Sequence, residues 1–215
     1  MSSPHHNFRV LGAAIAVTVA GLCGMLDTPA ARADPCPAVE VAFARGTGQP
    51  PGVGNVGQAF IDSLGSQISG RSMGVYPVNY PATEAFAASA QNGADDLVAH
   101  VQDMIGRCPN TRMVLGGFSQ GAGVIDLATP AMPPRAVDHV AAIAVFGNPT
   151  SALANRLSGT VFPPIAPPYA AKTVDMCAAG DPACSDGSNI NVFAHASYVQ
   201  SGMAAQAANL VAARL

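Results

Sequence analysis

Residues 113–128 read MVLGGFSQGAGVIDLA, and this stretch decides the fold. The apolar run Met113–Leu115 predicts a short buried strand, and residues 121–128 predict a helix that ends before Pro130. Between them lies the pattern G-x-S-x-G, centred on Ser119. A sharp turn from strand to helix strains the backbone of the serine, and the two glycines remove side chains that would clash. The serine hydroxyl is therefore expected at the carboxyl edge of a sheet, beside the positive end of a helix.

Strands and helices alternate through the rest of the chain. Short apolar runs predict strands at residues 39–43, 75–79, 139–146 and 173–176. Apolar residues at helical spacing predict helices at residues 56–69, 86–107 and 196–214, and the proline-rich residues 150–170 are interpreted as an ordered loop. Pro77 favours an edge position for its strand, whereas the continuous apolar run 139–146 favours a strand covered on both faces. The sequence therefore predicts one α/β domain with a mostly parallel sheet and helices on both faces.

Composition excludes several classes of protein. Of the 215 residues, 49% are hydrophobic and only 11% are charged, which excludes a disordered chain and a coiled coil. The net charge is −3, and Lys172 is the single lysine. A nucleic-acid-binding surface is therefore not expected.

The N-terminus has the pattern of an export signal. Residues 10–26 form an uncharged apolar run of 17 residues, and Ala31-Arg32-Ala33 follows as an A-x-A cleavage site. We interpret residues 1–33 as a signal peptide cut after Ala33, which leaves residues 34–215 as the mature domain; the alternative is an uncleaved anchor. The protein is then extracellular, either released or retained at the cell wall, and we expect a monomer.

Cysteine usage agrees with export. The chain has five cysteines, of which Cys23 lies in the predicted signal peptide. The other four suggest two disulfides, with three possible pairings. Cys177 and Cys184 are expected to close a small loop, which leaves Cys36 and Cys108 for a long one. Free thiols or a metal site are alternatives, but no C-x-x-C pair is present, and we expect neither a metal nor another cofactor.

A serine nucleophile needs a base, and the mature chain offers three histidines. His195 follows the last predicted strand, where a loop reaches the carboxyl edge of the sheet, so it is the preferred base. In proteins with this serine turn the base also comes last in the chain, after the acid. His100 is interpreted as a surface histidine within a helix. His139 precedes a strand and is expected at the opposite edge of the sheet.

The acid must lie between Ser119 and His195. Asp181 is preferred, because a loop closed by the two cysteines 177 and 184 would fix its carboxylate against an imidazole. Asp175, at a strand end, is a possible alternative, and Asp126 lies in the helix after the serine and is expected to point away. The remaining candidates are Asp138 and Asp186. The simpler interpretation of Asp181 is an ordinary Asp-Pro turn.

An oxyanion formed at the reacting carbon needs two donors. The N–H of Gln120 is one candidate, and Thr47, in the glycine-rich turn after the first strand, offers its N–H and its hydroxyl. The alternative for Thr47 is simple turn chemistry. Phe118, Val192 and Phe193 suggest an apolar acyl group rather than a sugar as substrate, unless they serve core packing.

These residues resemble the cutinase family of secreted serine esterases, in its actinobacterial (mycobacterial-type) branch. The resemblance extends over the whole mature chain and rests on motifs whose order and spacing agree with the family: Phe43-Ala44-Arg45-Gly46-Thr47, Gly116-Gly117-Phe118-Ser119-Gln120-Gly121, Cys177-x-x-Gly-Asp181-x-x-Cys184, and His195 followed by Tyr198. Fungal cutinases often have serine where Thr47 stands, so the hydroxyl is retained.

The resemblance implies a small α/β-hydrolase with a five-stranded parallel sheet and no large lid domain. It implies a catalytic triad of Ser119, Asp181 and His195, oxyanion donors at Thr47 and Gln120, and disulfides Cys36–Cys108 and Cys177–Cys184. The implied substrates are esters or lipids: cutin, short- or medium-chain esters, triacylglycerols, phospholipids or acetylated polysaccharides. Transient contact with a lipid surface is expected. The alternatives are a catalytically silent exported protein that binds lipids or surfaces, and a structural envelope protein.

Overall fold

The computed structural model describes Met1 and residues 36–215, so the predicted signal peptide and Cys23 lie outside the described residues. The folded part contains five strands, β1 (Val39–Ala44), β2 (Met73–Pro77), β3 (Arg112–Phe118), β4 (Val140–Phe146) and β5 (Thr173–Met176). Its α-helices are α1 (Gly54–Gln67), α2 (Phe86–Arg107), α3 (Gln120–Ala131), α4 (Ala136–His139), α5 (Ala152–Ser158), α6 (Pro167–Ala170) and α7 (Met203–Ala212), and a short 3₁₀ helix, η1, spans Ala194–Ala196.

The strands form one sheet in the order β2-β1-β3-β4-β5, and every neighbouring pair is parallel. All seven residues of β4 are buried, as the continuous apolar run predicted. β2 is an edge strand that ends at Pro77, so the edge position was correct, although the strand begins two residues earlier than predicted. The predicted α/β fold with a parallel sheet is confirmed.

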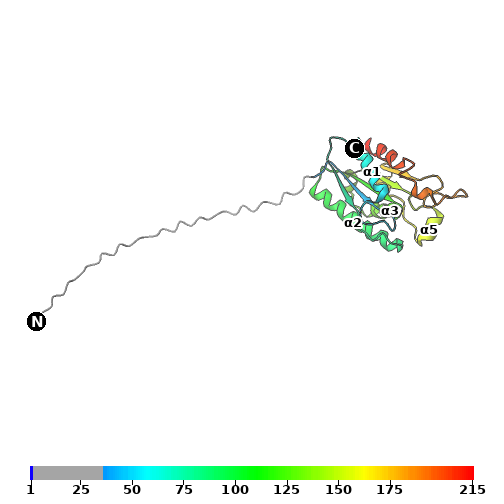
Figure 1. Cartoon of the computed structure of the whole chain (residues 1–215), viewed down its shortest axis with the longest axis horizontal. Coiled ribbons are helices and arrows are strands. Elements are labelled where there is room, and N and C mark those ends of the chain that lie inside the picture. Colours follow the sequence, from blue (N-terminus) through cyan, green and yellow to red (C-terminus); the bar gives the residue numbers. More distant parts are fainter. Residues whose placement is uncertain (2–35) are drawn as a thin grey trace. The chain divides into compact units, whose positions relative to one another are not determined.

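Helices cover both faces of the sheet (Figure 1). Helices α1 and α7 pack on one face over a cluster in which the rings of Phe43, Phe60 and Phe146 meet with centroids 5.9–6.3 Å apart. Helices α2 and α3 pack on the other face, where Leu97 and Ile125 are fully buried. Burying a side chain of this size contributes about 1.5–3 kcal/mol before the entropy cost of ordering it. The helices on both faces therefore stabilise the sheet. The candidate site described below lies at the carboxyl edge of this sheet.

Helix α3 is longer than predicted, because it continues through Pro130 to Ala131. Proline removes the N–H that would bond to the carbonyl four residues earlier, here that of Asp126. The hydroxyl of Thr129 donates to this carbonyl instead, at 3.3 Å. The carbonyl of Asp126 therefore keeps a partner. Pro130 stands one residue before the end of the helix, so it disturbs the helix little.

Two other segments also differ from the prediction. Residues 150–170, predicted as a loop, contain α5 and α6. The hydroxyl of Ser151 accepts a hydrogen bond from the first turn of α5 and caps it, and Pro167 begins α6 with a φ angle that suits a helix start. The last helix begins at Met203 rather than near residue 196, because Gly202 adopts a left-handed conformation (φ 76°) at its N-cap.

Both disulfides are present. Cys36–Cys108 joins the segment before β1 to the end of α2 across 72 residues, and Cys177–Cys184 closes a short loop after β5. By loop-closure entropy, the long disulfide contributes about 4–5 kcal/mol to stability.

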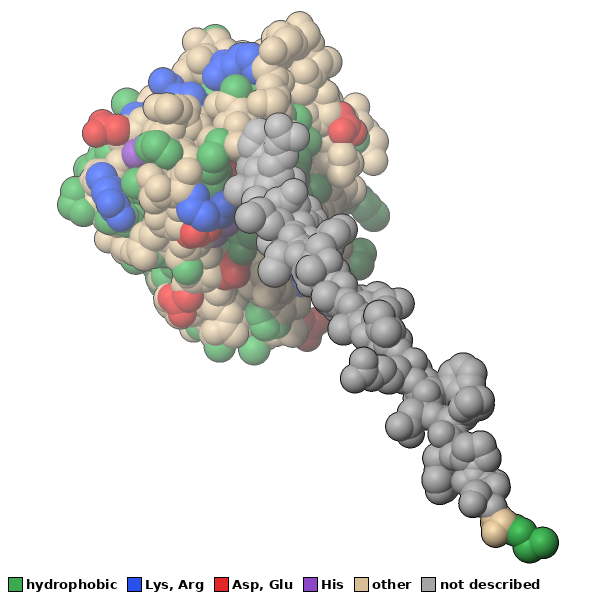
Figure 2. Space-filling view, turned by 90° about the vertical axis from the view of Figure 1, so that its left-hand side faces the viewer, with side chains coloured by type: hydrophobic (Ala, Val, Ile, Leu, Met, Phe, Trp, Pro, Cys, Tyr) green, Lys and Arg blue, Asp and Glu red, His purple; other side chains and the backbone are tan. Residues whose placement is uncertain are grey.

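The surface carries little charge. In Figure 2 both signs of charged side chain are present among mostly uncharged atoms, and neither collects into one large patch on this face. Within residues 36–215, no helix combines the length and apolar character needed to cross a bilayer.

One acidic side chain is buried beneath the carboxyl edge of the sheet. Asp126, in α3, is 1% exposed, and its Oδ1 accepts a hydrogen bond from the amide of Asn148 at 3.3 Å. Its Oδ2 and the Oδ1 of Asn148 have no partner among the described residues. Burial raises the pKa of Asp126 to about 7; the bond from Asn148 opposes the rise, and the carboxylate of Asp175 adds to it.

We expect the pH dependence of stability to change in Asp126→Asn. The folded protein binds the Asp126 proton more tightly than the unfolded chain does, so this group's contribution to stability is greatest at low pH. The wild type should lose up to about 4 kcal/mol of unfolding free energy relative to the variant as pH rises from about 4 to about 7. Urea unfolding of both proteins across this range measures the difference. A difference independent of pH would contradict it.

Candidate active site

Ser119 stands at the turn between β3 and α3. Its backbone has φ 56° and ψ −121°, a region that non-glycine residues rarely adopt. A Cβ at Gly117 would fall far inside contact distance of the carbonyl of Gly121, and one at Gly121 would do the same to the carbonyl of Ala44. The two glycines are therefore needed by close backbone approach, for the steric reason that the G-x-S-x-G pattern suggested.

Of the three residues predicted as a triad, His195 lies in hydrogen-bond contact with both of the others. The Nε2 of His195 is 2.9 Å from the Oγ of Ser119. The Nδ1 of His195 is 2.8 Å and 2.9 Å from the two carboxylate oxygens of Asp181. Ser119 comes from the turn after β3, Asp181 from the loop after β5 and His195 from η1. The ring of Phe118 stacks on that of His195 with centroids 4.9 Å apart, which supports the imidazole from one side.

Asp181 is completely buried and surrounded by donors. The hydroxyl of Tyr198 donates to its Oδ2 at 2.5 Å, and the N–H of Ala183 donates to its Oδ1 at 2.8 Å. Burial alone would raise the pKa of Asp181, but the hydrogen bonds from His195, Tyr198 and Ala183 outweigh it and hold the pKa below the usual value. The carboxylate therefore stays ionised. Tyr198 was noted in the sequence only as part of a motif, and no role was predicted for it.

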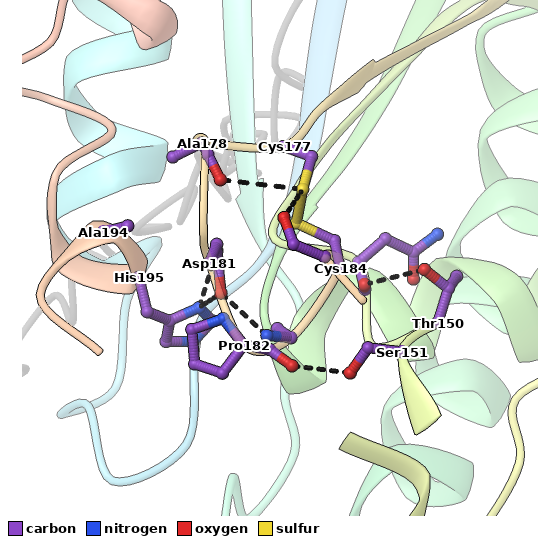
Figure 3. Close-up of a disulfide and its surroundings, with 12 residues drawn as sticks. Thr150, Ser151, Cys177, Ala178, Asp181, Pro182, Cys184, Ala194 and His195 are labelled. Carbon is purple, nitrogen blue, oxygen red and sulfur yellow. Dashed lines mark hydrogen bonds and ion pairs between the residues drawn. A yellow bond between two sulfur atoms is a disulfide. The ribbon is translucent and has the colours of Figure 1, made fainter. Parts of the chain in front are cut away.

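The loop that carries Asp181 is braced on two sides (Figure 3). The disulfide Cys177–Cys184 closes it. Ser151, which caps α5, donates from its hydroxyl to the carbonyl of Pro182 at 2.5 Å and from its N–H to the carbonyl of Ala183 at 3.0 Å. Ser151 is thus a structural partner of the acid loop that sequence reasoning missed, because the two segments are about 30 residues apart in the chain.

The candidate oxyanion donors lie at the start of α3 and in the turn that follows β1. Gln120 begins α3, so its N–H has no partner within the helix, and its side-chain amide donates to the carbonyl of Thr83 at 2.8 Å. The hydroxyl of Thr47 is buried without a partner among the described residues. Buried Arg45 steadies the Thr47 turn, since its guanidinium donates to the carbonyls of Gln49 (2.8 Å) and Tyr80 (2.7 Å).

A cavity of about 190 Å³ opens beside Ser119 and His195. Its other lining residues are mostly apolar: Phe86, Gln120, Pro149, Ala154, Leu157, Ser158, Phe162, Pro182 and Ala183. Of the three apolar residues named from the sequence, none lines this cavity: Phe118 packs against His195, and Val192 and Phe193 are 66% and 81% exposed. The expectation of an apolar environment was correct, but the residues that provide it were not those proposed.

The other candidate residues lie elsewhere. His100 is not a surface histidine: its Nε2 is 2.6 Å from Oε1 of Glu40, and its ring stacks on Tyr76, because α2 packs over β1 and β2. His139 ends α4 before β4, at the opposite end of the sheet from Ser119. Asp126 bonds to Asn148 rather than to His195. Within residues 36–215, no group of His, Cys, Asp or Glu side chains is arranged to hold a metal ion.

Comparisons with protein families and with known sequences agree on the family to which the chain is similar. A family model described as Cutinase matches residues 35–215. The chain is 53% identical over 214 residues to Carboxylesterase Culp1 of Mycobacterium tuberculosis, covering 99% of this chain and 98% of that one. It is 46% identical over 216 residues to Phospholipase Culp4 of the same species, covering 96% and 90%.

Solved structures agree with the sequence relatives. A Trichoderma reesei cutinase in complex with a C11Y4 phosphonate inhibitor is 33% identical, with a TM-score of 0.67, over 83% of this chain and 78% of that one. An acetylxylan esterase is 25% identical, with a TM-score of 0.68, over 84% and 99%. With this match over the whole folded part and a strand–serine–helix turn at its centre, the chain belongs to the cutinase family and is an ester hydrolase, as its motifs predicted.

Proposed function

We propose that the protein is a serine carboxylesterase that works through an acyl-enzyme, with Ser119 as nucleophile, His195 as base and Asp181 as the acid that orients the imidazole. The observation that carries the proposal is the continuous line of hydrogen bonds from Ser119 Oγ through His195 to Asp181. The base lies within reach of the proton it must remove, and a third group fixes its orientation.

The reaction follows from this geometry. His195 takes the proton of Ser119 as its oxygen attacks the ester carbonyl, and the oxyanion accepts hydrogen bonds from the Gln120 N–H and from Thr47. The imidazolium, stabilised by ionised Asp181, then protonates the departing alcohol. Water activated by His195 hydrolyses the acyl-enzyme and restores the serine. The hydroxyl of Thr47 has no partner among the described residues, so it can donate to an oxyanion, which supports the proposed role.

The proposed substrates are carboxylic esters with an apolar acyl chain. The cavity beside Ser119 is lined mainly by carbon atoms, which favours a hydrocarbon chain over a sugar. Relatives named as a carboxylesterase and a phospholipase are compatible with such a chain.

We expect Ser119→Ala to lower kcat on p-nitrophenyl butyrate by about 10⁴-fold or more, and Asp181→Asn by about 10⁴-fold, because the latter leaves the imidazole in the wrong tautomer. A fluorophosphonate probe should add one adduct to the wild type and none to Ser119→Ala, as intact mass reports. Ser66→Ala, an exposed serine on α1, is the matched control.

The outcomes separate the alternatives. Equal activity in the wild type and Ser119→Ala would refute the triad. Absence of both hydrolysis and labelling in the wild type would favour a catalytically silent protein that binds lipids or surfaces.

We also propose that residues 1–33 direct export and are removed after Ala33. The support is the two disulfides, which persist in oxidising compartments. N-terminal sequencing of protein recovered from culture medium and cell wall should give Asp34 as the first residue. A mature chain that still begins with residues 1–33 would support the uncleaved anchor instead.

An exposed apolar rim supports the proposed contact with lipid surfaces. Leu157, Val192 and Phe193 are 73%, 66% and 81% exposed, and Leu157 lines the cavity. Phe193 lies two residues before His195, which lines the cavity as well. Exposed side chains of this size gain free energy by entering an acyl layer.

We expect the double variant Val192→Ser, Phe193→Ser to lose at least about tenfold in activity on emulsified triacylglycerol, because two apolar contacts with the interface are lost. Its activity on dissolved short-chain esters should stay within about twofold of wild type. Val75→Ser, which changes an exposed valine on the edge strand β2, is the control. An equal loss on both substrates would argue against surface contact.

A further inference from the structure

One wall of the active-site cavity is fixed by an aromatic ring seated on a glycine. Phe162 lines the cavity, and its ring lies against α3 at Gly123. A Cβ at position 123 would be 2.7 Å from Cε1 of Phe162, so the ring occupies the space that a side chain would take. Glycine inside a helix is less stable than alanine, so the residue has a packing reason to be there.

This wall stands close to the nucleophile. Gly123 lies one helical turn after Ser119, and its N–H donates to the carbonyl of Ser119 at 3.2 Å. A chain attached to Ser119 that enters the cavity along α3 therefore meets the ring of Phe162.

The backbone that carries the ring is restrained. Pro163 and Pro164 follow Phe162 and limit its conformations. A short distance on, the N–H of Ala166 donates to the hydroxyl of Thr129 in α3 at 3.0 Å. The ring is also partly buried against the α2–α3 side of the core. Phe162 is therefore held from the backbone and from the core at once.

The part of the cavity wall that α5 provides is held more loosely. Helix α5 contributes Ala154, Leu157 and Ser158 to the cavity, but none of its residues is buried. Elements with few buried contacts move at low cost in free energy. A long chain can displace α5 more readily than it can displace Phe162.

We propose that Phe162, seated on Gly123, sets the longest acyl chain that the enzyme accepts in the cavity. The inference rests on the proposed function, because it takes Ser119 as the acylated residue. The acyl group is assigned to this cavity because it stays bonded to Ser119, which lines the cavity. Phe162 is thus a specificity-determining residue and takes no part in the chemistry.

The test is the profile of kcat/KM against acyl length for p-nitrophenyl esters from acetate to palmitate. In the wild type each added methylene that is seated should raise kcat/KM by about fourfold, up to a cut-off length. Phe162→Ala should move the cut-off to longer chains. Gly123→Ala should move it to shorter chains, because the new methyl group pushes the ring into the cavity.

The double variant Phe162→Ala, Gly123→Ala makes the test specific for the contact between these two residues. In the Phe162→Ala background there is no ring to displace, so Gly123→Ala should leave the cut-off unchanged. A general loss of stability would not produce this dependence of one substitution on the other. Phe162→Leu replaces Phe162→Ala where the smaller residue prevents folding, and Val161→Ala, which changes the exposed neighbour, is the matched control.

The profiles also distinguish a failure of this inference from a failure of the proposed function. If the wild type hydrolyses esters, Ser119→Ala does not, and all variants share the wild-type cut-off, the inference on Phe162 is wrong and the proposed function stands. If Phe162→Ala changes preference only along a series of acetate esters of longer alcohols, the cavity holds the alcohol, and the acyl assignment is wrong. A wild type with no activity on any ester would overturn both.

Discussion

The site depends on a close backbone approach at the start of α3. Gly121 lies so near the carbonyl of Ala44 that no side chain fits between them. The contact between Gly121 and Ala44 holds the first turn of α3 close to the end of β1. Ser119 therefore lies near the turn that follows β1 and carries Thr47. The sheet has β1 and β3 as neighbours, so the proposed nucleophile and the proposed oxyanion donor come from adjacent strand ends. A larger residue at 121 would separate them.

A second requirement is a carboxylate that stays charged in the interior. An unpaired buried charge is very costly, and Asp181 avoids this cost by accepting hydrogen bonds from three different groups. Each donor belongs to the short segment between β5 and α7, which the small disulfide and Ser151 hold in place. The same bonds that make the burial tolerable also orient His195 toward Ser119. Stability and proposed catalysis therefore rest on one network.

The meeting of His195 and Asp181 with Ser119 was implied by the resemblance to the cutinase family. Hydrophobic periodicity and turn chemistry predicted most of the strands and helices, the parallel sheet and the serine turn, although not α5 and α6. These features depend on short stretches of chain, such as a run of apolar residues or a glycine spaced two from a serine. Three features could not be predicted this way: the role of Tyr198, the brace at Ser151 and the contact of His100 with Glu40. Each is a contact between groups in separate segments of the chain, and their meeting depends on how helices and loops pack over the sheet.

The same dependence on packing explains why the apolar residues named from the sequence do not line the cavity. Phe118, Val192 and Phe193 were chosen because they are close to the site in the chain, but β3 directs Phe118 behind the imidazole, and the other two face solvent. The wall that is present comes from Phe86 and Phe162, about 30 and 40 residues from Ser119. Gly123 was the available signal: a glycine inside an apolar helix indicates that something packs close against that position.

The strained backbone at the start of α3 belongs to Ser119, the residue proposed to react. The positive-φ backbone of Ser119 costs about 1–3 kcal/mol. A sheet buried on both faces and a disulfide spanning 72 residues offset this cost without changing the site. A hydrogen bond from Thr47 to the oxyanion of the proposed reaction would form only in the transition state, and only stabilisation gained at that point accelerates the reaction.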